Sequence, residues 1–308
     1  MNKARVLNQG FWVAAAGIFL AAFLSSCGPG LIKADNPLIK ADPTATATVP
    51  PPPATDPPLP TATATEEVRP AEMIRITIVY DNYPYKAGLG TAWGFSAYIT
   101  HKDENILFDT GGSGSLLLSN LAALKIKPGG IQNVVLSHEH NDHTGGLQHL
   151  LSSGTDPNLY IPPSFSSGFK NQFRTQTQIV EVSPGLQIAE GMYTIGEMPG
   201  PPPEQGLVIK TSEGLIVITG CAHPGVEKMV SAAKRQFQED IYLVLGGFHL
   251  GSASDTRINQ IIAEFQRLGV KHVAPCHCTG DRAIGMFRNA FGEDFIPVGV
   301  GAVISVEG

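Results

Sequence analysis

The sequence lacks a surplus of basic residues and lacks an apolar run of the length that a membrane-spanning helix needs. Lys and Arg number 21 against 27 Asp and Glu, a formal net charge of −6. Nucleic-acid binding requires a basic surface against the phosphates, so the composition argues against a nucleic-acid partner. Hydrophobic residues make up 43% of the 308 residues, which is enough for a sizeable core in one globular unit.

The first 27 residues are typical of an export signal. Lys3 and Arg5 give a positive start, and the apolar run Phe11 to Leu24 is shorter than the roughly 20 residues that cross a bilayer. Leu24-Ser25-Ser26-Cys27 resembles the bacterial lipobox, which implies that Cys27 is lipidated and begins the mature chain. The alternative is an uncleaved membrane anchor. Either way we expect an exported protein that is anchored to the outer face of the cell membrane.

Residues 28–71 have the composition of a linker. They are rich in Pro, Thr and Ala, with a run of four prolines at 50–53 and no apolar period. Such a segment cannot bury a core, so we expect it to be extended and disordered. The folded domain is then predicted over residues 72–308.

Alternating apolar segments and turn residues predict an α/β domain. We expect strands at 74–78, 95–100, 105–108, 133–136, 206–210, 214–219, 241–245, 270–274, 295–298 and 302–306. Helices are expected at 116–124, 226–237 and 255–268, from residue 147, and after Gly280. Residues 152–178 are predicted to form a long irregular loop, because they are rich in Ser, Gly, Pro and Asn.

The densest group of metal-ligand side chains lies in the segment Ser137–Gly146, directly after an apolar strand. His138 and His140 are two positions apart, so in an extended chain both side chains leave on one side. Asp142 and His143 follow on the predicted turn, where Gly145-Gly146 would let the backbone bend sharply. Imidazole and carboxylate are good ligands for zinc, manganese or iron, so each pair suits one of two neighbouring ions.

Three more histidines follow later apolar strands and adjoin glycines, namely His223, His249 and His277. Strands of one sheet bring such ends together, so the recurrence supports a shared site. His101, His149 and His272 lack this context, and we expect them to be surface or packing residues.

The HxHxDH run from His138 to His143 resembles the signature of the metallo-β-lactamase superfamily. The resemblance implies an αββα four-layer sandwich with two divalent metal ions, most often zinc, at its edge. By position, it implies that His138, His140 and His223 hold one ion, and that Asp142, His143 and His277 hold the other. Asp109, in the segment Leu107-Phe108-Asp109-Thr110-Gly111, would brace the ligands from behind. Many relatives also have a bridging aspartate before the last histidine. Here that position offers Gly247-Phe248-His249, so His249 either replaces the aspartate or faces the substrate.

A narrower resemblance covers residues 74–300 through Asp81-Asn82 and the segments LFDTG, SHEHNDHTGGL, GCAHPG, GGFHL and PCHCTG. It is similar to the subfamily of 7,8-dihydropterin-6-methyl-4-(β-D-ribofuranosyl)aminobenzene-5′-phosphate synthases, which join two substrates with loss of diphosphate. Relatives often have Glu-His before the glycine that corresponds to Gly94. This chain has Ala92-Trp93, which predicts a different substrate contact.

The predicted function is hydrolysis or group transfer on a small anionic molecule, in which metal ions activate water or stabilise a leaving group. Asp142 and His249 are the candidate catalytic side chains, and Lys170 and Arg174 could meet an anionic substrate. The main alternative is a metal- or ligand-binding lipoprotein of the same fold without turnover. A β-lactamase and a diiron oxidoreductase fit the later motifs less well.

Three cysteines remain beside Cys27, an odd number for a protein outside the cytoplasm. Cys221, Cys276 and Cys278 could pack as small buried thiols, form a Cys221–Cys278 disulfide or supply a soft metal ligand. We expect packed thiols.

Overall fold

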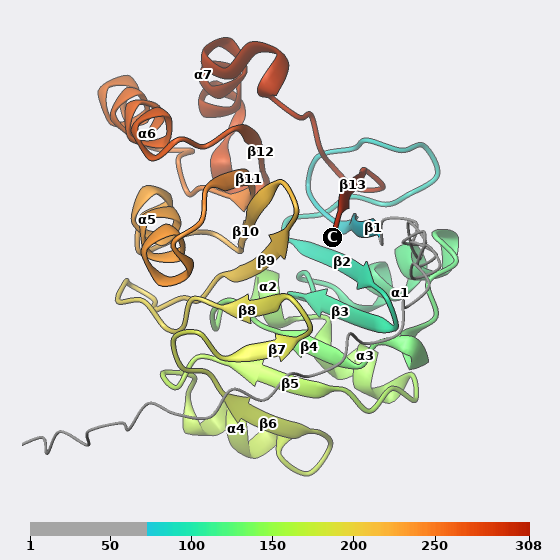
Figure 1. Cartoon of the computed structure of the whole chain (residues 1–308). Coiled ribbons are helices and arrows are strands. Elements are labelled where there is room, and N and C mark those ends of the chain that lie inside the picture. Colours follow the sequence, from blue (N-terminus) through green and yellow to red (C-terminus); the bar gives the residue numbers. More distant parts are fainter. Residues whose placement is uncertain (1–72) are drawn as a thin grey trace, which may run out of the picture. The chain divides into compact units, whose positions relative to one another are not determined.

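The computed structural model describes residues 73–308, which form two β-sheets with helices on their outer faces (Figure 1). The predicted signal, the linker and Cys27 lie outside the described residues. Among residues 73–308, no helix combines the length and apolar character that crossing a bilayer requires.

The first sheet has seven strands in the order β13-β1-β2-β3-β4-β5-β6. In chain order these are β1 (Met73–Tyr80), β2 (Ser96–His101), β3 (Glu104–Phe108), β4 (Asn133–Val135), β5 (Asn158–Ile161), β6 (Gln178–Glu181) and β13 (Val303–Glu307). Strands β3 to β6 run parallel, whereas β13, β1, β2 and β3 pair antiparallel. The parallel part therefore presents the carboxyl ends of β3 and β4 at one edge.

The second sheet has six strands in the order β12-β11-β10-β9-β8-β7. These are β7 (Gln187–Ala189), β8 (Met192–Thr194), β9 (Leu207–Thr211), β10 (Gly214–Thr219), β11 (Ile241–Gly247) and β12 (His272–Cys276). Strands β10, β11 and β12 are parallel to one another. Their carboxyl ends carry the segments with His223, His249 and His277.

Three apolar clusters divide the domain into four layers. The middle cluster joins the inner faces of the two sheets. A second cluster packs the outer face of the second sheet against α5 (Val226–Phe237), α6 (Asp255–Leu268) and α7 (Asp281–Phe291). The third packs the first sheet against α1 (Gly114–Ala123), α3 (Leu147–Ser152) and α4 (Ser167–Phe173). The predicted αββα four-layer sandwich is confirmed.

Helix α6 shows how the sequence specifies a layer. It begins after Ser254, whose side chain accepts a hydrogen bond from the amide of Arg257, and it ends at Gly269 in the left-handed conformation, with φ of 75°. Its buried side chains recur at intervals of three and four residues: Ile258, Ile261, Ile262, Phe265 and Leu268. This stripe faces the second sheet, so the helix lies flat on it.

Several boundaries differ from the expectation. Residues 295–298 form no strand and contribute one isolated bridge, Val273 to Phe295, and β12 begins at His272. The stretch 152–178 contains β5, α4 and the start of β6, because Phe165 and Phe173 are buried in the third cluster and anchor it. The prediction of a long irregular loop is therefore wrong.

Gly145 and Gly146 form no sharp turn, because both have helical backbone angles after the short helix α2 (Asn141–Thr144). Gly146 is required by close packing instead: an added Cβ would lie 2.1 Å from the carbonyl oxygen of Thr110. The missing side chain lets the histidine segment approach the segment after β3. The glycines thus set the distance between two parts of the candidate site.

Candidate metal centre

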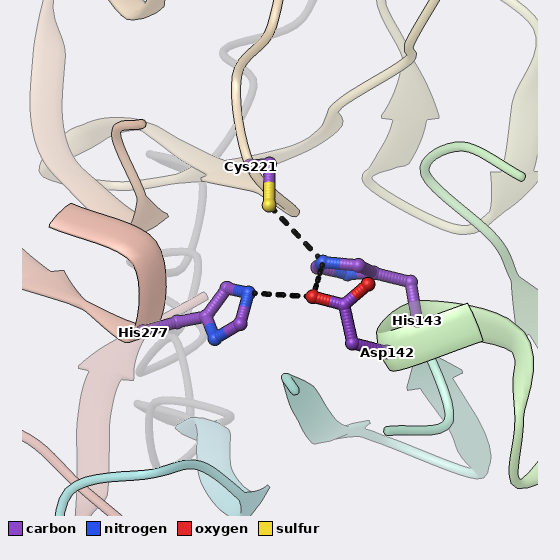
Figure 2. Close-up of side chains that lie close together, drawn as sticks. All are labelled: Asp142, His143, Cys221 and His277. Atoms are coloured by element: carbon purple, nitrogen blue, oxygen red, sulfur yellow. Dashed lines mark hydrogen bonds and ion pairs between the residues drawn. The ribbon is translucent and has the colours of Figure 1, made fainter. Parts of the chain in front are cut away.

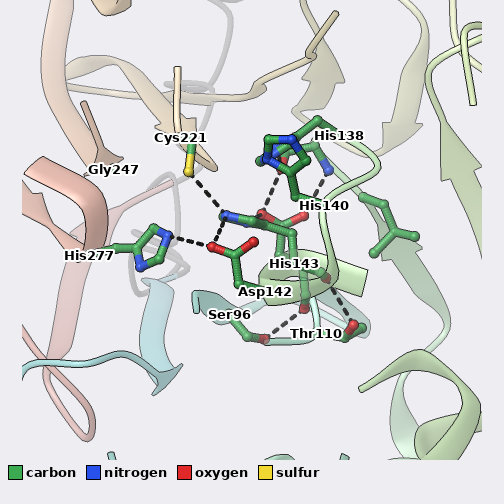
Figure 3. A network of polar contacts seen from close by, with 12 residues as sticks. Ser96, Thr110, His138, His140, Asp142, His143, Cys221, Gly247 and His277 are labelled. Carbon is green, nitrogen blue, oxygen red and sulfur yellow. Dashed lines mark hydrogen bonds and ion pairs between the residues drawn. The ribbon is translucent and has the colours of Figure 1, made fainter. Parts of the chain in front are cut away.

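The strand ends bring together every metal-ligand candidate of the HxHxDH segment with those of the later strands (Figure 3). The segment that follows β4 carries His138, His140, Asp142 and His143. His223 follows β10, and His277 opens a short 3₁₀ helix (His277–Thr279) after β12. The candidate site thus lies where the carboxyl ends of parallel strands from both sheets meet, a common location for sites in α/β proteins.

The first group comprises His138, His140 and His223. His138 Nε2 lies 3.1 Å from His140 Nδ1, and the ring centroids of His138 and His223 are 4.6 Å apart. The ring centroids of His140 and His223 are 5.0 Å apart. The ligand atoms of His138 and His223 lie within 4.8 Å of one another and of Cys221 Sγ. His140 adjoins both rings but shares no such group with them, so it is the less firmly placed ligand of the three.

The second group comprises Asp142, His143 and His277. Asp142 Oδ2 lies 3.6 Å from His143 Nε2 and 3.4 Å from His277 Nε2 (Figure 2). The ligand atoms of these residues and the Sγ atom of Cys221 all lie within 4.8 Å of one another. The group combines one carboxylate and two imidazoles, a donor set suited to a divalent cation.

Four of the rings are held through Nδ1, which leaves Nε2 directed toward the centre. His143 Nδ1 lies 2.7 Å from Asp109 Oδ2, His223 Nδ1 lies 2.8 Å from Glu204 Oε2, and His277 Nδ1 lies 2.9 Å from Asn82 Oδ1. These oxygens accept hydrogen bonds, so each Nδ1 donates. His138 Nδ1 lies 2.9 Å from Ser137 Oγ, and that hydroxyl donates to Asp109, so it too accepts from the ring.

This uniform tautomer provides a test of whether the residues fit a metal. An imidazole that donates through Nδ1 presents a lone pair at Nε2, the arrangement found where histidine binds metal. Nε2 of His277 is buried and makes no well-formed hydrogen bond; its nearest polar atom is Asp142 Oδ2 at 3.4 Å. A buried polar atom without a partner is costly, and a cation between the two groups would satisfy it. The donors present therefore fit divalent metal ions.

Burial and neighbouring charges shift the titration of these groups in opposite directions. Burial, reinforced by the charge of His143, lowers the pKa of His138 to about 2. Burial also lowers the pKa of His143, but the adjacent Asp109 carboxylate outweighs it and raises that pKa to about 9. For Asp142, hydrogen bonding and attraction from His277 and His143 outweigh burial and lower the pKa. The site therefore holds an ionised carboxylate beside one neutral and one readily charged imidazole.

The backbone is unusual at four positions of the site. Asp109, Ala222, His249 and His277 have positive φ values of 57°, 62°, 53° and 49°. Residues with a Cβ adopt this conformation at a cost, and they tend to do so at functional sites. Ala222 turns the chain between Cys221 and His223, so both neighbouring side chains reach the centre.

Glu204 is a part of the site that the sequence analysis missed. Its side chain is fully buried and accepts hydrogen bonds from the backbone amides of Cys221, Ala222 and His223 and from the ring of His223. It stands in a Pro-rich loop between β8 and β9, outside any periodic pattern. The one available signal was an acidic residue between a proline run and an apolar strand, which is too weak to identify it.

His249 is exposed and lies beside His223, with ring centroids 4.5 Å apart. It groups with Cys221 and Cys278, whose ligand atoms lie within 4.8 Å of its own, and it shares no group with His277 or Asp142. Among the described residues, the three remaining cysteines are all free. A cavity of about 170 Å³ is lined by His223, His249, Arg257 and Glu227 and otherwise by apolar residues and Gly225.

The other candidates lie elsewhere or are engaged. Lys170 pairs with Glu181 at 2.7 Å and donates to the carbonyl of Pro163, so it is held within its own segment. Arg174 ends helix α4. The histidines expected outside the site, His101, His149 and His272, belong to none of the groups that could hold a metal.

Asp81, at the end of β1, leads to a prediction about stability. It is fully buried, its Oδ2 has no hydrogen-bond partner, and burial raises its pKa from 3.8 to about 6. The protonated form is favoured by folding, so the fold loses stability as pH rises from 3.8 to about 6, in total about 3 kcal/mol. Asp81→Asn is expected to raise the free energy of unfolding at pH 7 by up to that amount and to change little at pH 4.

Urea unfolding of both proteins at several pH values checks this expectation. The exposed Asp103→Asn is the matched control and should leave the midpoint unchanged. A destabilised Asp81→Asn at pH 7 would show that the carboxylate is stabilised by a charge.

Comparison with known proteins agrees with this geometry. A family model described as the metallo-β-lactamase superfamily matches residues 94–257. A Methanocaldococcus jannaschii protein named 7,8-dihydropterin-6-methyl-4-(β-D-ribofuranosyl)-aminobenzene-5′-phosphate synthase is 30% identical over 247 residues, which cover 65% of this chain and 84% of that protein.

Solved structures agree on the fold. Tm1679, described as a metal-dependent hydrolase of the β-lactamase superfamily, is 29% identical with a TM-score of 0.65, covering 76% of this chain and 100% of its own. YhfI from Bacillus subtilis, a metallo-β-lactamase fold protein, shares the fold at 16% identity with a TM-score of 0.58, covering 76% of this chain and 99% of its own. The chain therefore belongs to the metallo-β-lactamase superfamily and is a metal-dependent enzyme of that fold.

Proposed function

We propose that this protein binds two divalent cations and uses them for hydrolysis or group transfer on a small anionic molecule. The observation that carries the proposal is the convergence of two donor groups, with four imidazoles fixed through Nδ1 and Nε2 aimed inward. His138, His140 and His223 would hold one ion. Asp142, His143 and His277 would hold the other.

Bound divalent cations lower the pKa of water toward about 7 and neutralise charge on phosphoryl oxygens. The chain supplies positioning around them. Asp109, Glu204 and Asn82 keep the rings in one tautomer, so the lone pairs need no reorientation during the reaction. Asp142 has a lowered pKa, so it accepts a hydrogen bond from the nucleophile and orients it without holding its proton.

His249 is the candidate proton donor. Its ring is exposed beside His223, outside the two donor groups, and it lines the small cavity. The neighbouring Cys278 raises the pKa of His249 above its ordinary value, which favours the protonated ring that a proton donor requires. In that position it can deliver a proton to a departing oxygen, which would give it a role other than replacing a bridging aspartate.

Phosphate esters or diphosphates are the favoured substrate class. The protein that is 30% identical is named as a synthase of a ribofuranosyl-aminobenzene 5′-phosphate. Arg257 lines the cavity beside His223 and His249, although it also pairs with Glu227 at 2.6 Å. Because the Glu227 side chain is largely buried, we expect Arg257 to meet a phosphate while it keeps this ion pair.

The test is a panel of phosphodiesters, aryl diphosphates, lactones and thioesters, assayed with the zinc- and manganese-loaded full chain. Turnover that a chelator abolishes and that metal restores is expected for at least one phosphate compound. Labelled water separates the two reaction types: hydrolysis places the label in the product, whereas group transfer releases diphosphate without it. A fully loaded protein that is inactive on every compound would overturn the proposal in favour of a non-catalytic binding protein.

Trp93 provides a direct optical report on the second ion. Its ring is 57% exposed and its centroid lies 4.8 Å from that of His277. In the Trp12→Phe chain it is the sole tryptophan. Cobalt binding at His277 is expected to quench most of its fluorescence, because a paramagnetic ion would lie within a few ångströms of the ring. Titration of the His277→Ala variant is the control, and equal quenching in both proteins would contradict the assignment.

We also propose that the protein is exported and anchored by lipid on Cys27. The support is the sequence alone: a positive start, a short apolar run and Leu24-Ser25-Ser26-Cys27. Labelling cells with a radioactive fatty acid should mark the wild-type protein and leave Cys27→Ser unlabelled. Label retained in Cys27→Ser, or a protein found wholly inside the cell, would refute the anchor.

A further inference from the structure

Cys221 holds a position that neither donor group accounts for. Its side chain is 3% exposed, and its Sγ lies 3.2 Å from His143 Nε2 (Figure 2). The same sulfur lies within 4.8 Å of the ligand atoms of Asp142 and His277 and, in a separate group, of His138 and His223. The sulfur is therefore shared by the whole second donor group and by His138 and His223 of the first, and it also groups with His249 and Cys278.

The backbone fixes the sulfur there from two sides. The amide of Cys221 donates to Glu204 Oε1 at 2.9 Å, and Ala222 then turns the chain in the left-handed conformation. On the preceding side, an added Cβ on Gly220 would lie 2.1 Å from Ser137 Oγ. The thiol is thus built into the same scaffold as Asp109 and Glu204, which hold His143 and His223.

The end of β11 has no room for a bridging carboxylate. It carries Gly247, and a Cβ there would lie 2.7 Å from the sulfur of Cys278 and 3.3 Å from the Cα of Cys221 (Figure 3). Any side chain from this strand end would collide with the two cysteines. The side chain between the two donor groups is thus the thiol of Cys221, which follows β10. No side chain from the end of β11 lies there.

Resting on the proposed function, we propose that the thiolate of Cys221 is a shared ligand that bridges the two metal ions. A bound thiolate loses its proton, and one sulfur can contact two cations as a carboxylate does with two oxygens. Because thiolate is a soft ligand, Cys221 biases the pair of sites toward zinc and away from manganese.

X-ray absorption at the zinc edge tests the bridge in the wild-type full chain loaded with two zinc ions. A shared thiolate gives one sulfur neighbour per zinc on average, at about 2.3 Å. A sulfur bound to a single ion gives half that number and overturns the bridge. No sulfur neighbour, or a Cys221–Cys278 disulfide found by mass spectrometry in the zinc-loaded protein, overturns the assignment altogether.

Cobalt substitution provides a second readout with matched variants. The cobalt-loaded wild type should show the near-ultraviolet charge-transfer absorption of a thiolate ligand. Cys221→Ser should lose it, whereas Cys276→Ser, at an equally buried thiol in the inter-sheet core, and Cys278→Ser should keep it. Absorption that survives in Cys221→Ser overturns the proposal.

The outcome is separable from that of the proposed function. A protein that holds two zinc ions and shows chelator-sensitive turnover, without any zinc–sulfur contact, keeps the proposed function and loses the bridge. A protein that retains no zinc at all loses both.

Discussion

Replacing Glu204 by alanine is expected to lower the free energy of unfolding by about 3–5 kcal/mol. The variant is also expected to lose the metal ion that His138, His140 and His223 would hold. The carboxylate is fully buried and receives four hydrogen bonds, three from backbone amides and one from the His223 ring. Its removal leaves those donors buried without partners, and each such group costs about 1–3 kcal/mol.

The charge of Glu204 carries much of this effect. Burial alone would raise its pKa, but the His223 hydrogen bond, the attraction of His138 and the backbone amides lower it from 4.5 to about 2. The contribution is therefore present above pH 4.5 and is lost as pH falls toward 2, in total about 3 kcal/mol. Glu204→Gln keeps the size but turns its amide group toward two donors, so we expect an intermediate loss.

Elemental analysis measures the metal content of Glu204→Ala, and urea unfolding of the same samples measures its free energy of unfolding. Glu293→Ala, at an exposed glutamate, is the control and should match the wild type in both. If Glu204→Ala kept its full metal content and unfolded at the wild-type midpoint, the carboxylate would not be what orients His223.

Glu204 belongs to a class of residues that the sequence did not reveal, namely those that orient the metal-ligand side chains. The ligand candidates stand in a dense motif or directly after apolar strands, so their types and positions indicated a shared site. The residues that orient them have no such pattern. Asp109 was expected only through the family resemblance, and Glu204 reaches His223 from a loop 19 positions earlier. Contacts of that kind depend on how the loop folds back, which periodicity does not encode.

The fold itself was largely predictable because its elements are strongly patterned. Strands β9 to β12 and helices α5 and α6 lie at or within two residues of their expected positions, whereas β7 and β8 of the same sheet were not predicted. The segments that were predicted wrongly have a common cause, which is tertiary packing. Buried Phe165 and Phe173 order a segment whose composition resembles a loop, and Gly146 serves a close backbone contact where a turn was expected.

Cys221 was interpreted from composition as a packed thiol, and it is indeed buried. The sequence did not predict which side chains surround the sulfur of Cys221. The sulfur faces His143, contributed by the other sheet 78 positions away, and two donor groups meet at it. A small buried thiol in an apolar core and a thiol between metal ligands have the same local sequence signal.

The second large effect is expected for Asp109→Asn, which should weaken metal binding by about 10–100-fold and change its dependence on pH. Asp109 is fully buried and accepts hydrogen bonds from the amide and hydroxyl of Ser137, at 2.7 and 2.8 Å, and from His143 Nδ1 at 2.7 Å. An asparagine retains one acceptor oxygen but places an amide group against the other donors. His143 would lose both its orientation and the neighbouring negative charge.

The pH dependence follows from the raised pKa of His143. In the metal-free protein this pKa is about 9, so at pH 7.5 the ring carries a proton that an ion at Nε2 must displace. The contribution of His143 to metal affinity should therefore rise with pH up to about 9 and level off above it. In the metal-free fold the charge on His143 contributes stability that is lost as pH rises from 6.5 through about 9. Burial raises the pKa of Asp109, so the ion pair is also lost at low pH, when that carboxylate takes up a proton. In Asp109→Asn, burial is opposed only by the weaker effects of Asp142 and Glu204, so we expect a neutral ring at pH 7.5 and one proton fewer released on binding.

Calorimetric titration of zinc in two buffers with different ionisation heats measures the number of protons released. The difference between wild type and Asp109→Asn is informative whether or not Cys221 also loses a proton, because that proton is common to both proteins. Asp156→Asn, at an exposed aspartate, should release as many protons as the wild type. An equal count in Asp109→Asn and wild type would mean that His143 is already neutral before the ion arrives, and that the carboxylate beside it acts on the orientation of the ring alone.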